Sequence, residues 1–178
     1  MQLGIEASNL RLGGGITHLS EILRAADPQA HGFSRVIVWS GRATLEALPS
    51  KEWLDLEYKT FLDAGLARRT WWQTVQLARE ARRAGCDLLF VPGGSYSGSF
   101  RPFVTMSRNM LPFERRERAR YGVSSMRVKL KVLERVQSAS MRRADGVIFL
   151  NEYARSRITE RAGVLQVELR MEKMKGCP

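Results

Sequence analysis

Short apolar runs alternate with segments of helical periodicity along this chain, and the alternation limits the folds open to it. The runs at Ser34–Trp39 (SRVIVW) and Asp87–Val91 (DLLFV) lack regular polar alternation, which is typical of strands covered on both faces. Between such runs, apolar residues recur three and four positions apart, as at Ile16, Leu19 and Leu23. The pattern predicts an α/β fold, a doubly wound, mostly parallel Rossmann-like sheet with helices on both faces.

The expected elements follow from these periods and from the turn residues between them. Strands are predicted from Leu3 onward and at Ser34–Trp39, Trp53–Tyr58, Asp87–Val91, Phe103–Ser107 and Asp145–Leu150. Helices are predicted at Thr17–Ala26, Ala43–Leu48, Ala67–Ala84, Glu114–Ala144 and from Asn151 to Arg161. The run Trp53–Tyr58 alternates apolar and acidic residues, which is the pattern of an edge strand with one wet face.

Three details of the helices can be checked directly. In Ala67–Ala84, the spacing places Trp71, Val75, Ala78 and Ala81 or Arg82 on one side, with Trp72 and Leu77 flanking them. Both tryptophans are expected to pack in the core. Gly85 is expected as the C′ residue of that helix, because glycine enters the left-handed region freely. Asn151 is expected as an N-cap, because its side chain accepts a hydrogen bond from an unpaired backbone N–H group.

The length of 178 residues suffices for one domain with a real core. We expect a domain over residues 1–162 and an irregular tail over residues 163–178, either a remnant of truncation or frameshift or a fragment's natural end. The chain has two cysteines and two histidines and no CxxC pair, so we expect neither a disulfide framework nor a structural metal. We expect a cytoplasmic location, or a peripheral one at the cytoplasmic face of a membrane.

Three consecutive glycines follow the first predicted strand and precede the first helix. A turn of this kind holds phosphate in many proteins, because helix N–H groups point at it and side chains do not block it. The candidate phosphate- or donor-proximal residues are Gly13, Gly14, Gly15, Thr17 and His18. The turn lacks the third glycine of GxGxxG and the Gly-Lys-Ser/Thr of a P-loop. It is therefore either a general anion cradle or a tight turn without ligand, and His18 either contacts an anion or stabilises local structure.

Positive charge is concentrated between Arg101 and Arg143, and the whole chain has a net charge of +11. Within this stretch, one helical face holds Arg127, Lys131, Arg135 and Arg142, and another holds Met126, Leu130, Leu133 and Met141. A basic amphipathic helix of this kind suits an anionic membrane surface. Two alternatives remain open: a solvated basic face with its apolar side in the core, and nucleic-acid binding, which lacks a recognition motif here.

Four segments in order resemble one enzyme family: the strand–GGG–helix opening, DLLFVPGG, TMSRNMLPF and DGVIFLNEYARSRI. Together they are similar to the N-terminal half of GT-B glycosyltransferases of family 4 (glycosyl transferases group 1), from Leu3 to about Arg161. The resemblance implies two Rossmann-like domains, acceptor binding by the N-terminal one and binding of a nucleotide-sugar donor by the other. It implies transfer that is usually retaining, without a metal or other cofactor.

On this resemblance, the chain is the acceptor-binding half of a hexosyl- or related transferase, inactive without its donor-binding domain. The glycine turn would approach the donor diphosphate, and the residues facing a sugar or lipid-linked acceptor would be Ser95, Tyr96, Arg108, Asn109 and Asn151. No catalytic residue is assigned, because Asn109 stands near the place where many relatives have a histidine. The alternative function is a stand-alone basic module that binds nucleotides or nucleic acid, although nucleic acid is the less expected partner.

Overall fold

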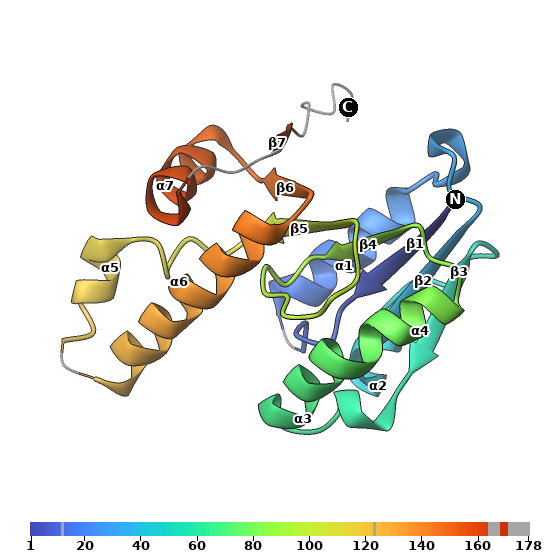
Figure 1. The fold of residues 1–178 in the computed structure, drawn as a ribbon, viewed down its shortest axis with the longest axis horizontal. Coiled ribbons are helices and arrows are strands. Elements are labelled where there is room, and N and C mark those ends of the chain that lie inside the picture. The colour runs from blue at the N-terminus through green and yellow to red at the C-terminus, as the bar shows by residue number, and fades with distance from the viewer. Residues whose placement is uncertain (12, 123, 164–167, 171–178) are drawn as a thin grey trace. The chain divides into compact units, whose positions relative to one another are not determined.

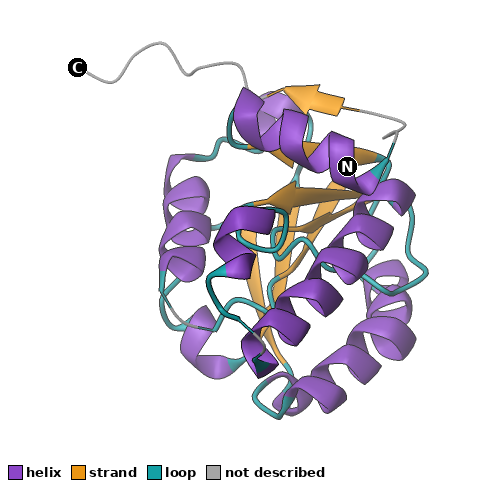
Figure 2. Cartoon of the chain, turned by 90° about the vertical axis from the view of Figure 1, so that its left-hand side faces the viewer, coloured by secondary structure: helices purple, strands orange, loops and turns teal. Residues whose placement is uncertain are grey.

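The computed structural model describes residues 1–11, 13–122, 124–163 and 168–170. The chain divides into two compact units, and each is described by itself. Unit 1 comprises Met1–Gly93 with Ser97–Phe103, and unit 2 comprises Gly94–Tyr96 and the chain from Val104 onward. Helices and strands alternate along both units (Figure 2).

Unit 1 contains four parallel strands: β1 (Gln2–Glu6), β2 (Arg35–Ser40), β3 (Leu54–Tyr58) and β4 (Leu88–Val91). Their order is β3-β2-β1-β4, and in this register Leu3 pairs with both Val36 and Leu88. All four strands lie where the sequence predicts them, within one residue at most boundaries. The edge position of β3 is as predicted. The expected difference between its faces holds only at its start, because Leu54 is buried whereas Leu56 and Tyr58 are each 38% exposed.

The strand order makes the sheet doubly wound. From β1 the chain proceeds outward to β2 and β3, and then returns to β4 on the other side of β1. Because parallel crossovers are right-handed, the helices before and after this reversal must cover opposite faces of the sheet. Figure 1 shows α1 (Gly14–Ala25) and α4 (Leu77–Arg83) on opposite sides of the unit 1 strands. The reversal lies between β1 and β4, which is where such sheets open to ligands at their carboxyl edge.

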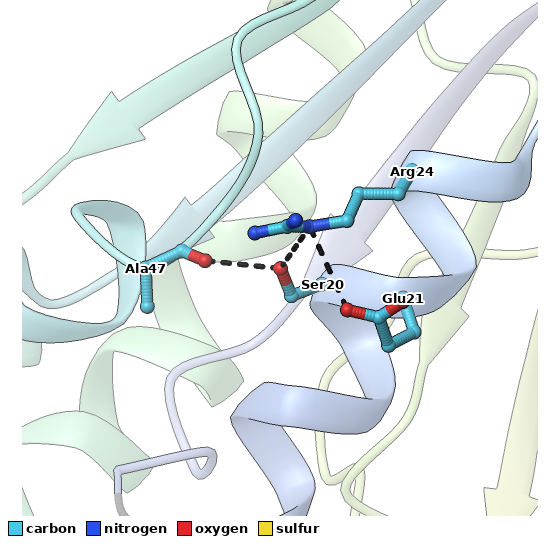
Figure 3. Close-up of polar contacts among 4 residues, drawn as sticks. All are labelled: Ser20, Glu21, Arg24 and Ala47. Atoms are coloured by element: carbon cyan, nitrogen blue, oxygen red, sulfur yellow. Dashed lines mark hydrogen bonds and ion pairs between the residues drawn. The ribbon is translucent and has the colours of Figure 1, made fainter.

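The core of unit 1 joins α1 to the strands beneath it. Its buried members include Ile5, Leu19, Leu23, Val36 and Val38. Polar contacts fix α1 laterally, since the Ser20 hydroxyl donates to the Ala47 carbonyl at 3.0 Å. Arg24 lies over the same hydroxyl, with Nε 3.4 Å from Ser20 Oγ and 3.6 Å from the Glu21 carboxylate (Figure 3). The helix is thus tied to the loop that follows the short helix α2 (Arg42–Leu45).

The long helix predicted at Ala67–Ala84 is present but is not uniform. It consists of α3 (Leu66–Trp71), a π-helical segment (Trp72–Gln76) and α4. Core packing is confirmed for Trp72, which is buried, and wrong for Trp71, which is 47% exposed. Val75, on the predicted side of Trp71, is 51% exposed, whereas the flanking Leu77 is buried. The wider π turn breaks the 3.6-residue period on which the prediction depended. Gly85 does end the run at φ +69°, with its N–H bonded to the Arg82 carbonyl, as predicted.

Unit 2 contains the parallel strands β5 (Phe103–Ser107, whose first residue belongs to unit 1), β6 (Gly146–Phe149) and β7 (Glu168–Arg170), in that order. The predictions for β5 and β6 are confirmed. In the tail predicted to be irregular, the described residues 168–170 form a strand beside β6. The other predictions for this tail concern residues 164–167 and 171–178, which lie outside the described residues.

The basic stretch predicted as one helical region forms two helices, α5 (Arg115–Ala119) and α6 (Ser125–Arg143). Gly122, at φ +54°, lies in the break between them. Arg118 of α5 is buried, where it forms an ion pair with Glu134 of α6 and donates to the Pro112 carbonyl at 2.9 Å. Arg118 is therefore a packing residue of unit 2, although the sequence places it within the basic stretch.

The last helix, α7 (Glu152–Ala162), begins as predicted. The Asn151 side chain accepts from the Ala154 N–H at 2.8 Å, which confirms it as the N-cap. At the other end of α7, Arg142 of α6 donates to the Ala162 carbonyl at 2.7 Å. At each end of α7, a side chain thus pairs with a backbone group that has no partner within the helix.

Candidate functional site

A pocket of about 330 Å³ opens at the carboxyl edge of the unit 1 sheet. We call it the edge pocket, and its walls come from the segments that follow β1, β2 and β3. Its lining residues are Ser8, Arg11, Gly41, Ala43, Thr44, Leu62 and Asp63. Ligands of open parallel sheets gather at this edge, and the volume is at the small end of the range of small-molecule sites.

The wall between β2 and β3 depends on the absence of a side chain at Gly41. A Cβ at this position would overlap the Asp63 carboxylate and lie 3.2 Å from the Leu62 carbonyl oxygen. The close approach lets Asp63 Oδ1 accept the backbone N–H of Arg42 at 3.0 Å. The Asp63 carboxylate is therefore fixed at the pocket while the residue as a whole stays exposed.

Arg11 also lines the pocket, and it bonds to the loop that contains Asp63. Its guanidinium donates to the carbonyls of Asp63 at 3.1 Å and Ala64 at 3.4 Å. A guanidinium has more N–H donors than these two carbonyls use, so donors remain for a ligand. Arg11 and Asp63 together give the edge pocket one cationic and one anionic group.

The lining residue Ser8 is held by a buried carboxylate, Glu6, at the end of β1. It is fully buried and accepts from the Ser8 N–H at 3.0 Å, from the Ser8 hydroxyl and from Gln73 Nε2 at 3.0 Å. Burial raises the pKa of Glu6, and these hydrogen bonds and the positive charge of Arg69 oppose that rise. Arg69 also donates to the Ser8 carbonyl at 2.9 Å, so the loop after β1 is held from two sides.

A second hollow, of about 250 Å³, lies over β2 and β3 beside α4. Its charged side chains are already paired: Arg35 binds Asp55, and Arg83 lies 3.7 Å from Glu80. Lys59, outside the hollow, lies 3.4 Å from Glu57 and 3.3 Å from Glu80. Mutual pairing of this kind satisfies the charges that a ligand would otherwise meet. The edge pocket is therefore the stronger candidate.

The predicted phosphate-proximal residues lie after β1, beyond the pocket-lining residues Ser8 and Arg11. Gly13 has φ +71°, which explains why a glycine is needed there, and the helix begins at Gly14, earlier than predicted. A Cβ at Gly13 or Gly14 would meet nothing within 4 Å, so the turn presents open backbone. Gly13, Gly14 and Thr17 are exposed, whereas Gly15 and His18 are half-buried. None of these residues lines the edge pocket, and their phosphate-proximal role stays a prediction.

The predicted acceptor-side residues all belong to unit 2. The side chain of Asn109 accepts from the Leu111 N–H at 3.0 Å, and that of Asn151 caps α7. Both amides therefore stabilise local backbone structure. This is the common use of asparagine in turns and at helix starts.

The other three acceptor-side candidates differ in exposure. Tyr96 is 2% exposed, and its backbone N–H bonds the Ser140 hydroxyl at 3.0 Å, so its ring belongs to the core of unit 2. Ser95 and Arg108 are half-buried, and burial lowers the pKa of Arg108. An acceptor-side role for these residues stays a prediction.

The basic residues predicted on one face of α6 are mainly accessible. Lys131, Arg135 and Arg142 are exposed, whereas Arg127 is half-buried and donates to the Gly122 carbonyl at 3.3 Å. On the predicted apolar face, Leu130 and Met141 are buried. Leu133 is half-buried and Met126 is 44% exposed, so this face lies in the core only in part. Binding of an anionic surface by the basic residues stays a prediction.

Sequence reasoning missed the residues that line the edge pocket. The loop after β1 was conspicuous only for its glycines, although Ser8 and Arg11 precede them. Asp63 carried no local signal, because its role depends on Gly41, which is distant in sequence. The alternation of strands and helices does predict that the segments after β1, β2 and β3 meet at one edge.

No protein-family model, no curated protein and no solved structure matches this chain. Within the described part of the chain, no helix is long and apolar enough to cross a membrane. The same residues contain no cluster of His, Cys, Asp and Glu side chains suited to holding a metal ion.

Proposed function

We propose that this chain is the acceptor-binding α/β domain of a nucleotide-sugar-dependent glycosyltransferase, and that the edge pocket binds a hydroxyl-bearing acceptor. The observation that carries the proposal is the position of the pocket at the carboxyl edge of a doubly wound sheet, beside an open glycine turn. The resemblance of four segments to family 4 GT-B enzymes supports the glycosyltransferase assignment. The place of the acceptor in the edge pocket rests on the pocket itself, because the acceptor-side residues implied by the resemblance belong to unit 2 and do not line it.

The chemistry of the pocket suits a sugar. Each sugar hydroxyl both donates and accepts, so it needs donors and acceptors close together. Arg11 supplies N–H donors and Asp63 supplies carboxylate oxygens, and both residues line the pocket. The hydroxyls of Ser8 and Thr44 donate to Glu6 and to the Leu10 carbonyl, so their oxygens still have lone pairs that can accept.

The open turn suits the second substrate of such an enzyme. A nucleotide sugar carries a diphosphate, which becomes more negative as the sugar leaves. Exposed backbone at Gly13 and Gly14, at the start of α1, can approach such a group without obstruction. The net charge of +11 attracts anionic substrates generally.

The proposal is tested by ligand-detected NMR, with a panel of monosaccharides, glycosyl phosphates and nucleoside diphosphates. We expect saturation transfer to at least one sugar, which Ala43→Phe abolishes because Ala43 is an exposed residue lining the pocket. Ala30→Phe is the matched control, since Ala30 is exposed and lies before β2, at the amino end of the sheet.

Two results would count against the proposal. Sugar signals that persist in Ala43→Phe would place sugar binding outside the edge pocket. Response to nucleoside diphosphates alone, lost at low concentrations of competing phosphate, would favour the alternative of a stand-alone nucleotide-binding module.

A further inference from the structure

The outward side of α6 carries a row of aliphatic residues that the apolar pattern of the sequence did not single out. Val128, Val132 and Val136 recur every four residues, so they lie in a line along the helix. They are 61%, 53% and 40% exposed, whereas Leu130 and Met141 of the same helix are buried. We call these three side chains the valine row.

Positive charge lies along the valine row. By helical position, Lys129 is on one flank, and Lys131, Arg135 and Arg142 are on the other; all four are exposed. The sequence of α6 contains one acidic residue, Glu134, which pairs with the buried Arg118 and is 19% exposed. The outward side of α6 is therefore aliphatic at its centre, with one cation on one flank and three on the other, of which Arg142 also donates to the Ala162 carbonyl.

We propose that the valine row and its basic flanks dock α6 flat onto an anionic lipid surface. Valine side chains gain free energy by entering the boundary between headgroups and acyl chains, and flanking Lys and Arg side chains bind anionic headgroups. Long basic side chains can also extend sideways while their aliphatic stems stay with the valines. The proposal does not involve the edge pocket. Its test is therefore independent of whether that pocket binds a sugar.

Two other partners, nucleic acid and a second copy of this chain, fit the valine row and its basic flanks less well. Nucleic acid would satisfy the cations but offers little to a row of exposed aliphatic side chains, and no recognition motif accompanies them. A second copy of this face would bring like charges together with no exposed acid on α6 to offset them. An anionic lipid surface offers acyl chains to the valines and negatively charged headgroups to the lysines and arginines.

Vesicle flotation of the full chain provides the test. Vesicles of phosphatidylcholine with about one third phosphatidylglycerol should bind the protein, and pure phosphatidylcholine should not. Each headgroup contact is worth about 1 kcal/mol, so Lys131→Gln with Arg135→Gln should weaken binding about twentyfold or more. Val128→Ser with Val132→Ser should weaken it roughly tenfold.

The matched controls make equal changes elsewhere. Arg79→Gln with Arg82→Gln removes two exposed cations from α4, and Val75→Ser removes an exposed valine from the π-helical segment. These controls should bind anionic vesicles nearly as the wild type does. Circular dichroism of every variant verifies that α6 still folds.

A second measurement examines insertion directly. Val132→Trp should add a fluorescence component that shifts to the blue on anionic vesicles and does not shift on neutral ones. Equal binding to both vesicle types, unchanged binding by the two serine substitutions, or binding to RNA but not to vesicles would each overturn the proposal. So would a concentration-dependent dimer that the serine substitutions abolish.

Discussion

At the scale of single residues, the pKa of Glu6 is set by the burial of its carboxylate and by the groups around it. Its carboxylate has three donors around it, yet burial is the dominant influence and raises its pKa above the ordinary value of 4.5. The residue ends β1 and holds the start of the loop that contributes Ser8 and Arg11 to the edge pocket. Its protonation therefore links pH to the stability of unit 1.

The expected pH dependence follows from the direction of that shift. The folded chain keeps this proton to a higher pH than the unfolded chain, so the Glu6 contribution is fully present below about pH 4.5 and is lost as pH rises through the raised pKa. Glutamine does not ionise, so in Glu6→Gln the stability of the fold should no longer fall as pH rises through the pKa of Glu6. Urea unfolding over a pH series should show the free energy of unfolding changing in favour of the variant as pH rises, and a constant difference would contradict this assignment.

Gly41 provides a test of the pocket wall. A methyl group there would displace the Asp63 carboxylate or the backbone of Leu62, so Gly41→Ala should lower the free energy of unfolding by about 1–3 kcal/mol. Gly65→Ala is the control, because a Cβ at Gly65 would meet nothing within 4 Å and its φ of −63° suits alanine. Chemical denaturation compares the two, and an equal effect would show that the Asp63 contact is not what requires glycine.

At the scale of elements, the sequence predicts helix ends correctly where a capping residue next to the helix sets them. The start of α7 and the end of α4 are set by Asn151 and Gly85, and both are used as predicted. The face of α3 and α4 is different, because the π-helical segment changes the period within the helix. This segment also contains Gln73, whose contact with Glu6 comes from another element of the fold.

The N-cap of α7 permits a prediction at this scale. Asn151→Ala removes the acceptor of the Ala154 N–H and should lower the free energy of unfolding by about 1 kcal/mol. Asn151→Ser, which restores an acceptor at the cap, should recover most of it. Thermal unfolding followed by circular dichroism distinguishes the two, and an alanine variant as stable as the serine variant would show that the cap contributes little.

At the scale of the whole molecule, the net charge of +11 is the dominant electrostatic fact. Like charges repel in a compact chain, and salt screens them over about 10 Å at 0.1 M. The ion pairs Arg24–Glu21, Arg120–Glu117 and Arg157–Glu160 join exposed side chains and contribute little. Raising sodium chloride from low to physiological concentration should therefore increase the Tm by about a few degrees.

Differential scanning calorimetry in sodium chloride and in sodium acetate checks this prediction. Similar increases in both salts would indicate screening, whereas a Tm that falls with salt would show that attractive pairs outweigh the repulsion. Replacing the exposed Arg79 and Arg82 by glutamine should reduce the salt response.

The sequence by itself determined the order of elements and the class of sheet. Continuous apolar runs mark buried parallel strands, and turn and cap residues mark where helices begin and end, because these effects act over a few neighbouring residues. It also placed the glycine turn correctly after β1, with Gly13 in a conformation that requires glycine.

Only the tertiary structure decided which of these residues meet. The edge pocket joins segments after three strands, and its Asp63 is held by groups around Gly41 that lie more than twenty residues away. On α6, burial of Leu130 and Met141 left the valine row outward, which periodicity could not decide because both sides of the helix carry apolar residues. Packing between distant segments fixes such choices, since a helix buries whichever side its neighbours cover.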